Sequence, residues 1–364
     1  MNMKMLMMAA AVTPLAFSAF AQTPEAVANR ASFAAHRVSP GIGVKFRQLP
    51  MRYGDTSRTQ TSCAKDPTVI RHGDRYLMYY SLPPIDEETR AKRGECPEEL
   101  NSWASAIAES RDLVNWRRIG DMDLRDTAGR RVLGAAAPCV KRIDGRIHLF
   151  YQRYLESARN NVLWLATSED GIRFTNAFDE PVFVPRNKWA KTKAIDAEVY
   201  RVGDSLMLLY ATRDAATGKV QQLGMAKAPY GSDYSPARWT ELTVDTPFFG
   251  PEKPWEQRCI EAPTVIEAEG VWYLFYAGSF NNARQQIGLA TSTDGLHYRR
   301  YGHDGLVFPC GCAGTWNSCE SGHPGVFRDD DGRIYMFYQG KSKMPGASSG
   351  YELSCAEVIL SANL

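Results

Sequence analysis

The stretch CIEAPTVIEAEGVWYLFYAGS, from Cys259 to Ser279, sets the pattern of the whole chain because the chain repeats it. It reads as an acidic residue and Ala-Pro, a short β-branched strand, a Glu-Gly turn, and a strand rich in aromatic and aliphatic residues. The other copies are KDPTVIRHGDRYLMYYS from Lys65, APCVKRIDGRIHLFYQR from Ala137, IDAEVYRVGDSLMLLYATR from Ile195 and GHPGVFRDDDGRIYMFYQGK from Gly322. Five copies, spaced roughly 60 to 70 residues apart, indicate a repeat architecture.

Each copy is followed by a second half, such as QQIGLATSTDGLHYRRYG after the Cys259 copy, with a small-residue strand and an aromatic-bearing strand. Two strands plus two strands make a four-stranded antiparallel meander. The runs LMYY, IHLFY, LMLLY, WYLFY and YMFY are continuously apolar, as in strands that are covered on both faces. We therefore predict an all-β fold, a five-bladed β-propeller of four-stranded antiparallel blades. A two-sheet β-sandwich is the alternative, and the five-fold period argues against it.

Three segments divide the chain. Residues 1–21 combine one early lysine, an apolar run and small residues at Ala19 and Ala21, which is typical of a secretory signal peptide. We therefore expect a secreted or periplasmic protein. Residues 22–58 are polar and mixed, and we expect a short N-terminal arm that packs on the propeller, pairs with another subunit in an oligomer, or is a partly ordered leader. Residues 59–364 form the propeller.

Composition excludes two classes of partner. The net charge of +2 gives no basic patch for nucleic acid, and no later stretch is long and apolar enough to span a membrane. Eight cysteines in an exported chain predict disulfide bonds, with the loop bearing Cys310, Cys312 and Cys319 held by such bonds rather than by a metal. The charged, proline-bearing insertion over residues 82–101 is expected to form a loop over one mouth of the propeller.

The chemistry is expected where each blade's first strand begins, because these strands surround the axis of a propeller and their corresponding positions converge. The residues at these positions are Asp66, Ala137, Asp196, Glu261 and His323. A purely structural repeat is expected to keep one turn residue at all five. Prolines that follow closely in four copies hold the local backbone extended, which positions the preceding side chains.

Three converging carboxylates suit glycoside hydrolysis. One carboxylate must stay ionised and draw a proton from water, while another must deliver a proton to the leaving oxygen. A third nearby raises the pKa of the acid through like-charge repulsion.

The order of Asp-Pro, Ala-Pro, Ile-Asp, Glu-Ala-Pro and Gly-His in successive copies resembles glycoside hydrolase family 43, which is related to families 117, 62 and 32. The resemblance implies a five-bladed propeller and, mostly, inverting enzymes that release arabinose, xylose or galactose units from plant polysaccharides. It implies Asp66 as general base, Asp196 as pKa modulator and Glu261 as general acid. No cofactor is required, although His323 matches a histidine that contacts a structural calcium or ordered water in several members. Either Asp196 or Glu198 faces the axis, and register favours Asp196.

Other functions fit parts of the pattern. Family 117 anhydro-galactosidases, which act on agar oligosaccharides, share the propeller, a helical arm and a Ser-Gly-His like the one ending at His323. A glycan-binding propeller without catalysis would not need all three carboxylates. A phosphorylase would need clustered basic residues, for which Lys191, Lys193 and Arg213 are candidates.

The expected partner is a carbohydrate substrate. His323, Trp103, Arg213 and Trp316 are the candidate substrate-binding residues, since indoles stack on sugar faces and guanidinium groups bind hydroxyls or carboxylates. The alternative for the tryptophans is packing between or within blades, and for Arg213 it is a salt bridge.

Overall fold

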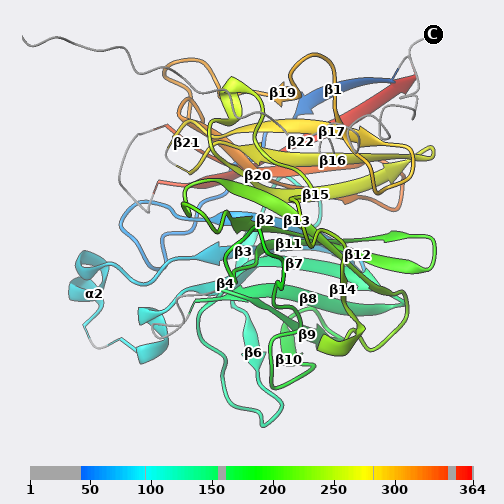
Figure 1. Cartoon of the computed structure of the whole chain (residues 1–364). Coiled ribbons are helices and arrows are strands. Elements are labelled where there is room, and N and C mark those ends of the chain that lie inside the picture. Colours follow the sequence, from blue (N-terminus) through cyan, green and yellow to red (C-terminus); the bar gives the residue numbers. More distant parts are fainter. Residues whose placement is uncertain (1–41, 95, 155–160, 282, 343–349, 363–364) are drawn as a thin grey trace, which may run out of the picture. The chain divides into compact units, whose positions relative to one another are not determined.

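The strands of the computed structural model, which describes residues 42–94, 96–154, 161–281, 283–342 and 350–362, form five sheets (Figure 1). The first sheet contains β2 (Lys65–His72), β3 (Arg75–Leu82), β4 (Ala104–Ser110) and β5 (Arg117–Asp121). The second contains β7 (Ala135–Ile143), β8 (Arg146–Arg153), β9 (Leu163–Ser168), β10 (Arg173–Asn176) and the parallel edge strand β6 (Asp123–Arg125). The third contains β11 (Ile195–Val202), β12 (Ser205–Arg213), β13 (Gln221–Pro229) and β14 (Thr240–Glu241). The fourth contains β15 (Ile260–Ala268), β16 (Val271–Gly278), β17 (Gln286–Ser292), β18 (Arg299–Arg300) and β19 (Leu306–Phe308). The fifth contains β20 (Glu320–Arg328), β21 (Ile334–Lys341), β22 (Glu352–Ala362) and β1 (Ile42–Gln48).

The inner strands β2, β7, β11, β15 and β20 contact one another in that order, and β20 contacts β2 to close the ring. An apolar cluster fills each of the five seams between neighbouring blades. The second strands are therefore covered on both faces, and β21 is buried along its whole length. The predicted all-β five-bladed propeller with mainly four-stranded antiparallel blades is confirmed.

Residues 42–48, the part of the predicted N-terminal arm that forms β1, belong to the fifth blade. Strand β1, blue in Figure 1, pairs antiparallel with β22, which is red, from Ile42 opposite Ala362 to Gln48 opposite Ala356. Residues 42–48 are thus the outermost strand of this blade. They cover the edge of β22, which would otherwise be unpaired. The predicted signal peptide and residues 22–41 of the arm lie outside the described residues.

A β-bulge interrupts every inner strand close to its start. The strand register shifts at five equivalent places, and the first residue of each bulge has a positive φ although none is glycine. These residues are Asp66 (54°), Ala137 (46°), Asp196 (52°), Ala262 (47°) and His323 (43°). Left-handed backbone is costly for such residues, and it persists only where the surroundings hold it.

The prediction of disulfide bonds is wrong in this structure, since none of the eight cysteines forms a disulfide. Four of them, Cys63, Cys139, Cys259 and Cys355, are buried, where a thiol packs as a small apolar group. Burial raises the pKa of the Cys63 and Cys139 thiols to about 12.

The insertion after β3 contains α2 (Glu87–Arg93) and the short 3-10 helix η2 (Glu98–Asn101); two more 3-10 turns are η3 (Pro236–Arg238) and η4 (Pro254–Glu256). Asp86 caps α2 by accepting a hydrogen bond from the Thr89 amide at 2.7 Å. In the part of the chain that the structure describes, no helix has the length and hydropathy needed to cross a bilayer.

We predict that Phe46→Ala destabilises the propeller, because its ring packs edge-on against Phe308 and Phe275 at centroid distances of 5.1 and 6.3 Å. The half-buried ring should contribute about 2 kcal/mol to the free energy of unfolding, less than the ~3–5 kcal/mol of a fully buried phenylalanine. Urea unfolding measures this loss, with the exposed neighbour Lys45→Ala as control. Equal stability of the two variants would show that β1 does not support the blade.

Candidate active site

The five bulges line a cavity of about 50 Å³ on the propeller axis, to which each blade contributes the same three positions. The lining residues are Asp66, Pro67, Thr68, Ala137, Pro138, Cys139, Asp196, Ala197, Glu198, Ala262, Pro263, Thr264, His323, Pro324 and Gly325. The predicted convergence of the inner-strand starts is therefore observed. A polar cavity of this size holds water or a single ion, so a sugar would have to bind above it.

The register of Glu261 differs from the predicted one. The bulge residue of the fourth blade is Ala262, and Glu261 comes one position earlier, where the first blade has Lys65 and the fifth has Gly322. Asp66, Ala137 and His323 directly precede a proline, whereas Ala262 separates Glu261 from Pro263. Treating the two spacings as equivalent shifted the predicted register by one residue. The longer glutamate arm nevertheless contacts His323.

The imidazole of His323 lies between two of the predicted acids. Its Nδ1 is 2.8 Å from Asp66 Oδ1 and its Nε2 is 3.3 Å from Glu261 Oε1. Burial opposes the charge of the ring, but the two carboxylates raise the pKa of His323 well above its usual value. The ring is therefore an imidazolium, whose charge lies between the two carboxylates.

Asp66 is held as a carboxylate. Burial works against its charge, but Lys65 and His323 keep the pKa of Asp66 well below its usual range. Its bulged backbone amide donates to Gln339 Oε1 at 3.1 Å. The side chain is 12% exposed, so it can still meet water at the mouth.

Glu261 is also held as a carboxylate, by donors on both oxygens. Gln285 Nε2 donates to Oε1 at 2.6 Å, and Gln221 Nε2 donates to Oε2. Burial raises the pKa of Glu261, but the hydrogen bond and charge of His323 outweigh it and lower that pKa.

Asp196 is in the opposite state. Its amide donates to Gln152 Oε1 at 2.8 Å, whereas its Oδ2 is buried with no hydrogen-bond partner among the described residues. Burial raises the pKa of Asp196 to about 7. The charge of His323 opposes this shift, whereas the charges of Glu261 and Asp66 add to it. Single ligand atoms of Asp196, Glu261 and His323 lie within 4.8 Å of one another. The cluster thus combines two carboxylates, one imidazolium and one carboxyl group that keeps its proton up to neutral pH.

A set of polar side chains at the ends of second strands was missed from the sequence. Gln339, Ser81 and Gln152 each accept a hydrogen bond from the bulged amide of the next blade, those of Asp66, Ala137 and Asp196 respectively. The repeated Phe-Tyr-Gln that ends the runs LFYQ and MFYQ was the available signal for the two glutamines.

Glu198, the alternative to Asp196, also lines the axial cavity. It accepts from Lys141 Nζ and from the Val265 amide, both at 2.8 Å. The ion pair with Lys141 and the hydrogen bond from Val265 link blades two, three and four. The Glu198 carboxylate therefore has a structural role.

The predicted substrate-binding residues fall in different places. Trp103 stacks on Tyr154 with ring centroids 5.4 Å apart, near Lys65. Arg213 donates from Nε to Gln221 Oε1 at 3.1 Å, and Gln221 in turn donates to Glu261. Trp316 instead packs on Tyr338, with Arg52 over its ring and with its edge in the space that a side chain at Gly340 would fill.

The trio of Asp196, Glu261 and His323 is close enough to hold a metal ion. It does not fit the implied calcium well, because calcium takes six to eight oxygen ligands, whereas one of these three groups is an imidazole that already faces two carboxylates. We therefore derive no step through a metal.

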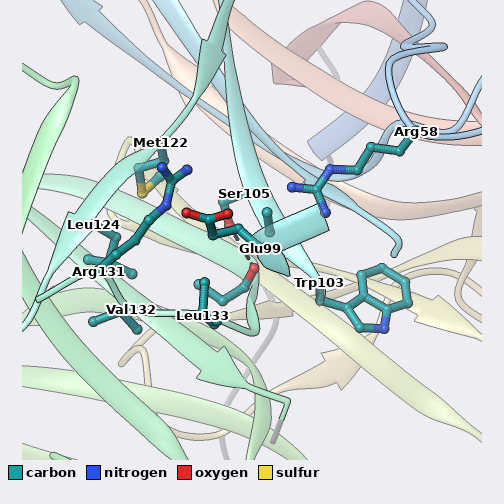
Figure 2. A pocket seen from close by; sticks show the side chains of 11 residues that line it. Arg58, Glu99, Trp103, Ser105, Met122, Leu124, Arg131, Val132 and Leu133 are labelled. Carbon is teal, nitrogen blue, oxygen red and sulfur yellow. Dashed lines mark hydrogen bonds between the residues drawn. The ribbon is translucent and has the colours of Figure 1, made fainter. Parts of the chain in front are cut away.

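A second hollow, shown in Figure 2, lies beside Trp103 between the first blade and the 124–135 segment. Its volume is about 20 Å³, enough for a single water, and its lining includes Arg58, Glu99 and Arg131. It therefore does not compete with the axial cluster as a sugar site.

Known proteins resemble this chain along most of its length. The family model of "Glycosyl hydrolases family 43" matches residues 59–360. A thermostable family-43 glycoside hydrolase has a similar structure at 19% identity and a TM-score of 0.63, covering 85% of this chain and 95% of its own. The catalytic domain of the GH62 α-L-arabinofuranosidase of Coprinopsis cinerea is similar at 14% identity and a TM-score of 0.59, covering 86% and 97%.

A curated relative, the 1,2-β-oligomannan phosphorylase of Thermoanaerobacter sp. (strain X514), is 24% identical over 178 residues. That match covers 44% of this chain and 58% of the relative, so the chain spans little more than half of the relative's length. The family match, by contrast, runs through all five blades of the propeller, and the chain belongs to glycoside hydrolase family 43.

Proposed function

We propose that the protein is an exported inverting glycosidase that acts on arabinofuranosyl, xylosyl or galactosyl linkages in plant or algal poly- and oligosaccharides. The observation that carries the proposal is the axial cluster, where Asp66 is ionised and one proton stays on the Asp196–Glu261 pair near neutral pH. Hydrolysis of a glycoside needs one carboxylate and one proton donor. The likeness to a GH62 arabinofuranosidase supports the choice of sugars, and the N-terminal residues 1–21 support export.

In the proposed mechanism Asp66 is the general base. Its carboxylate draws a proton from the water that attacks the anomeric carbon, and the His323 imidazolium holds the carboxylate in place. The imidazole ring between Asp66 and Glu261 keeps these residues apart, as suits the ~6.5–9.5 Å separation of inverting enzymes.

The proton for the leaving oxygen comes from the Asp196–Glu261 pair. At rest it lies on Asp196, whose partner-free Oδ2 suits a protonated carboxyl group. We propose that Glu261, the general acid, receives this proton through one bridging water, since its ligand atom and that of Asp196 lie within 4.8 Å of each other, and delivers it to the leaving oxygen. Asp196 stores the proton, and its pKa of about 7 sets the pH range in which the proton is available.

The first test is a screen of the purified protein against arabinofuranosyl, xylosyl, galactosyl and agar-derived substrates. Proton NMR of the first product should show the anomeric configuration inverted. Retention of configuration would exclude Asp66 as a base acting on water. Glycan binding without release of sugar by the wild type would leave a binding propeller.

We predict that Asp66→Asn and Glu261→Gln each lower kcat by about 10²–10⁴-fold, because each removes a proton-transfer group. Circular dichroism and thermal unfolding should show an intact fold. Glu267→Gln is the matched control, since Glu267 is an exposed glutamate on the same strand as Glu261. Normal activity in either active-site variant would remove the role assigned to that residue.

The pH profile provides a separate prediction. A proton donor with its pKa raised to about 7 is loaded below that pH and empty above it, so kcat/KM should fall as the pH rises through about 7. Asp196→Asn should lower activity and move this alkaline limb. An unchanged limb in that variant would assign the titration to another group.

A further inference from the structure

Two cations, Lys193 and Arg213, lie close to the proposed acid. Lys193 precedes β11 by two residues, and Arg213 is the last residue of β12. The two chain segments are tied together, since the Lys191 amide donates to the Arg213 carbonyl at 2.9 Å and Thr212 Oγ1 donates to the Lys191 carbonyl at 3.2 Å. Both side chains are half-buried.

The Arg213 guanidinium is linked to the acid through one amide. Its Nε donates to Gln221 Oε1 at 3.1 Å, and the Nε2 of the same glutamine donates to Glu261 Oε2. Its Nη1 donates to the Gly218 carbonyl at 3.2 Å, and the aromatic face of Phe280 lies 4.8 Å from the guanidinium carbon. The orientation of Arg213 is therefore fixed by neutral groups only.

Neither cation has a carboxylate of its own. Within the described ranges Arg213 forms no ion pair, and the Lys193 ammonium has no hydrogen-bond partner. Burial and the charge of Arg213 lower the pKa of Lys193, although Asp196 and Glu261 oppose this. An anion bound to both cations would offset their mutual repulsion.

We propose that Lys193 and Arg213 form an oxyanion-binding subsite beside Glu261. Its ligand is a carboxylate or phosphate group, which comes either from an acidic (uronosyl) sugar of the substrate or from inorganic phosphate. This inference rests on the proposed function and names the substrate class of that site. Its position on the acid side favours a carboxylate that the substrate carries on its leaving group.

If the anion is inorganic phosphate, it binds on the leaving-group side of the anomeric carbon. An inverting nucleophile attacks from the opposite face, where Asp66 lies, so this phosphate does not replace the attacking water and the products of hydrolysis are unchanged. The limited similarity to a 1,2-β-oligomannan phosphorylase makes phosphate binding worth measuring.

The test measures binding separately from turnover. Isothermal titration of Glu261→Gln protein with galacturonate, glucuronate and inorganic phosphate, at constant ionic strength, should give a dissociation constant for at least one anion. Adding Lys193→Gln or Arg213→Gln should weaken that binding about 10-fold or more, because each removes a charge-assisted hydrogen bond. Lys193→Arg should retain it, which separates loss of charge from loss of structure.

Lys188→Gln is the matched control, because Lys188 is an exposed lysine paired with Asp245 at 3.3 Å. No binding of any anion, or equal binding in all variants, would overturn the inference. Activity on neutral glycosides would meanwhile show whether the proposed function itself stands. Binding of uronates but not phosphate identifies an acidic sugar, and binding of phosphate but not uronates identifies inorganic phosphate.

Discussion

The β-bulge at the start of each inner strand is the constraint on which the site depends. Each bulge places a non-glycine residue in left-handed backbone, at a cost of ~1–3 kcal/mol. Three of the strained backbone amides donate hydrogen bonds to side chains of the preceding blade, which are Gln339, Ser81 and Gln152. The apolar seams keep the blades close enough for these bonds to form. Packing between blades therefore sets the direction of the acidic side chains at the axis.

The same arrangement explains how three acids coexist in one small buried space. The imidazolium of His323 neutralises part of the charge of Asp66 and Glu261, and Lys65 adds a second cation near Asp66. Asp196 keeps its proton chiefly because burial, with the charges of Glu261 and Asp66, raises its pKa to about 7. Two aspartates at equivalent positions of the first and third blades thus take different roles, Asp66 as base and Asp196 as proton store, because different charged groups surround each carboxylate.

The fold could be predicted from sequence because its period is long and its second strands are apolar throughout. The site was predicted less completely. Asp66, Asp196 and His323 follow from their equivalent positions, but the register of Glu261 does not, since a bulge breaks the alternation on which register is based. The predicted disulfide bonds are absent from the structure, because composition and an expected compartment do not show which thiols face each other. The role of β1 depends on pairing between residues as distant as Arg47 and Glu357, which no local pattern reveals.

This distant pairing has a consequence for how the protein is made. During synthesis β1 emerges early, yet its partner β22 follows only after four complete blades, so β1 must wait with an unpaired edge while the other sheets assemble. Such an edge invites pairing with other chains, and the positive charges of Lys45 and Arg47 on the strand reduce that risk. Ring closure should then be the slow step of folding, because the ends of a long chain must meet before the fifth blade gains its outer strand.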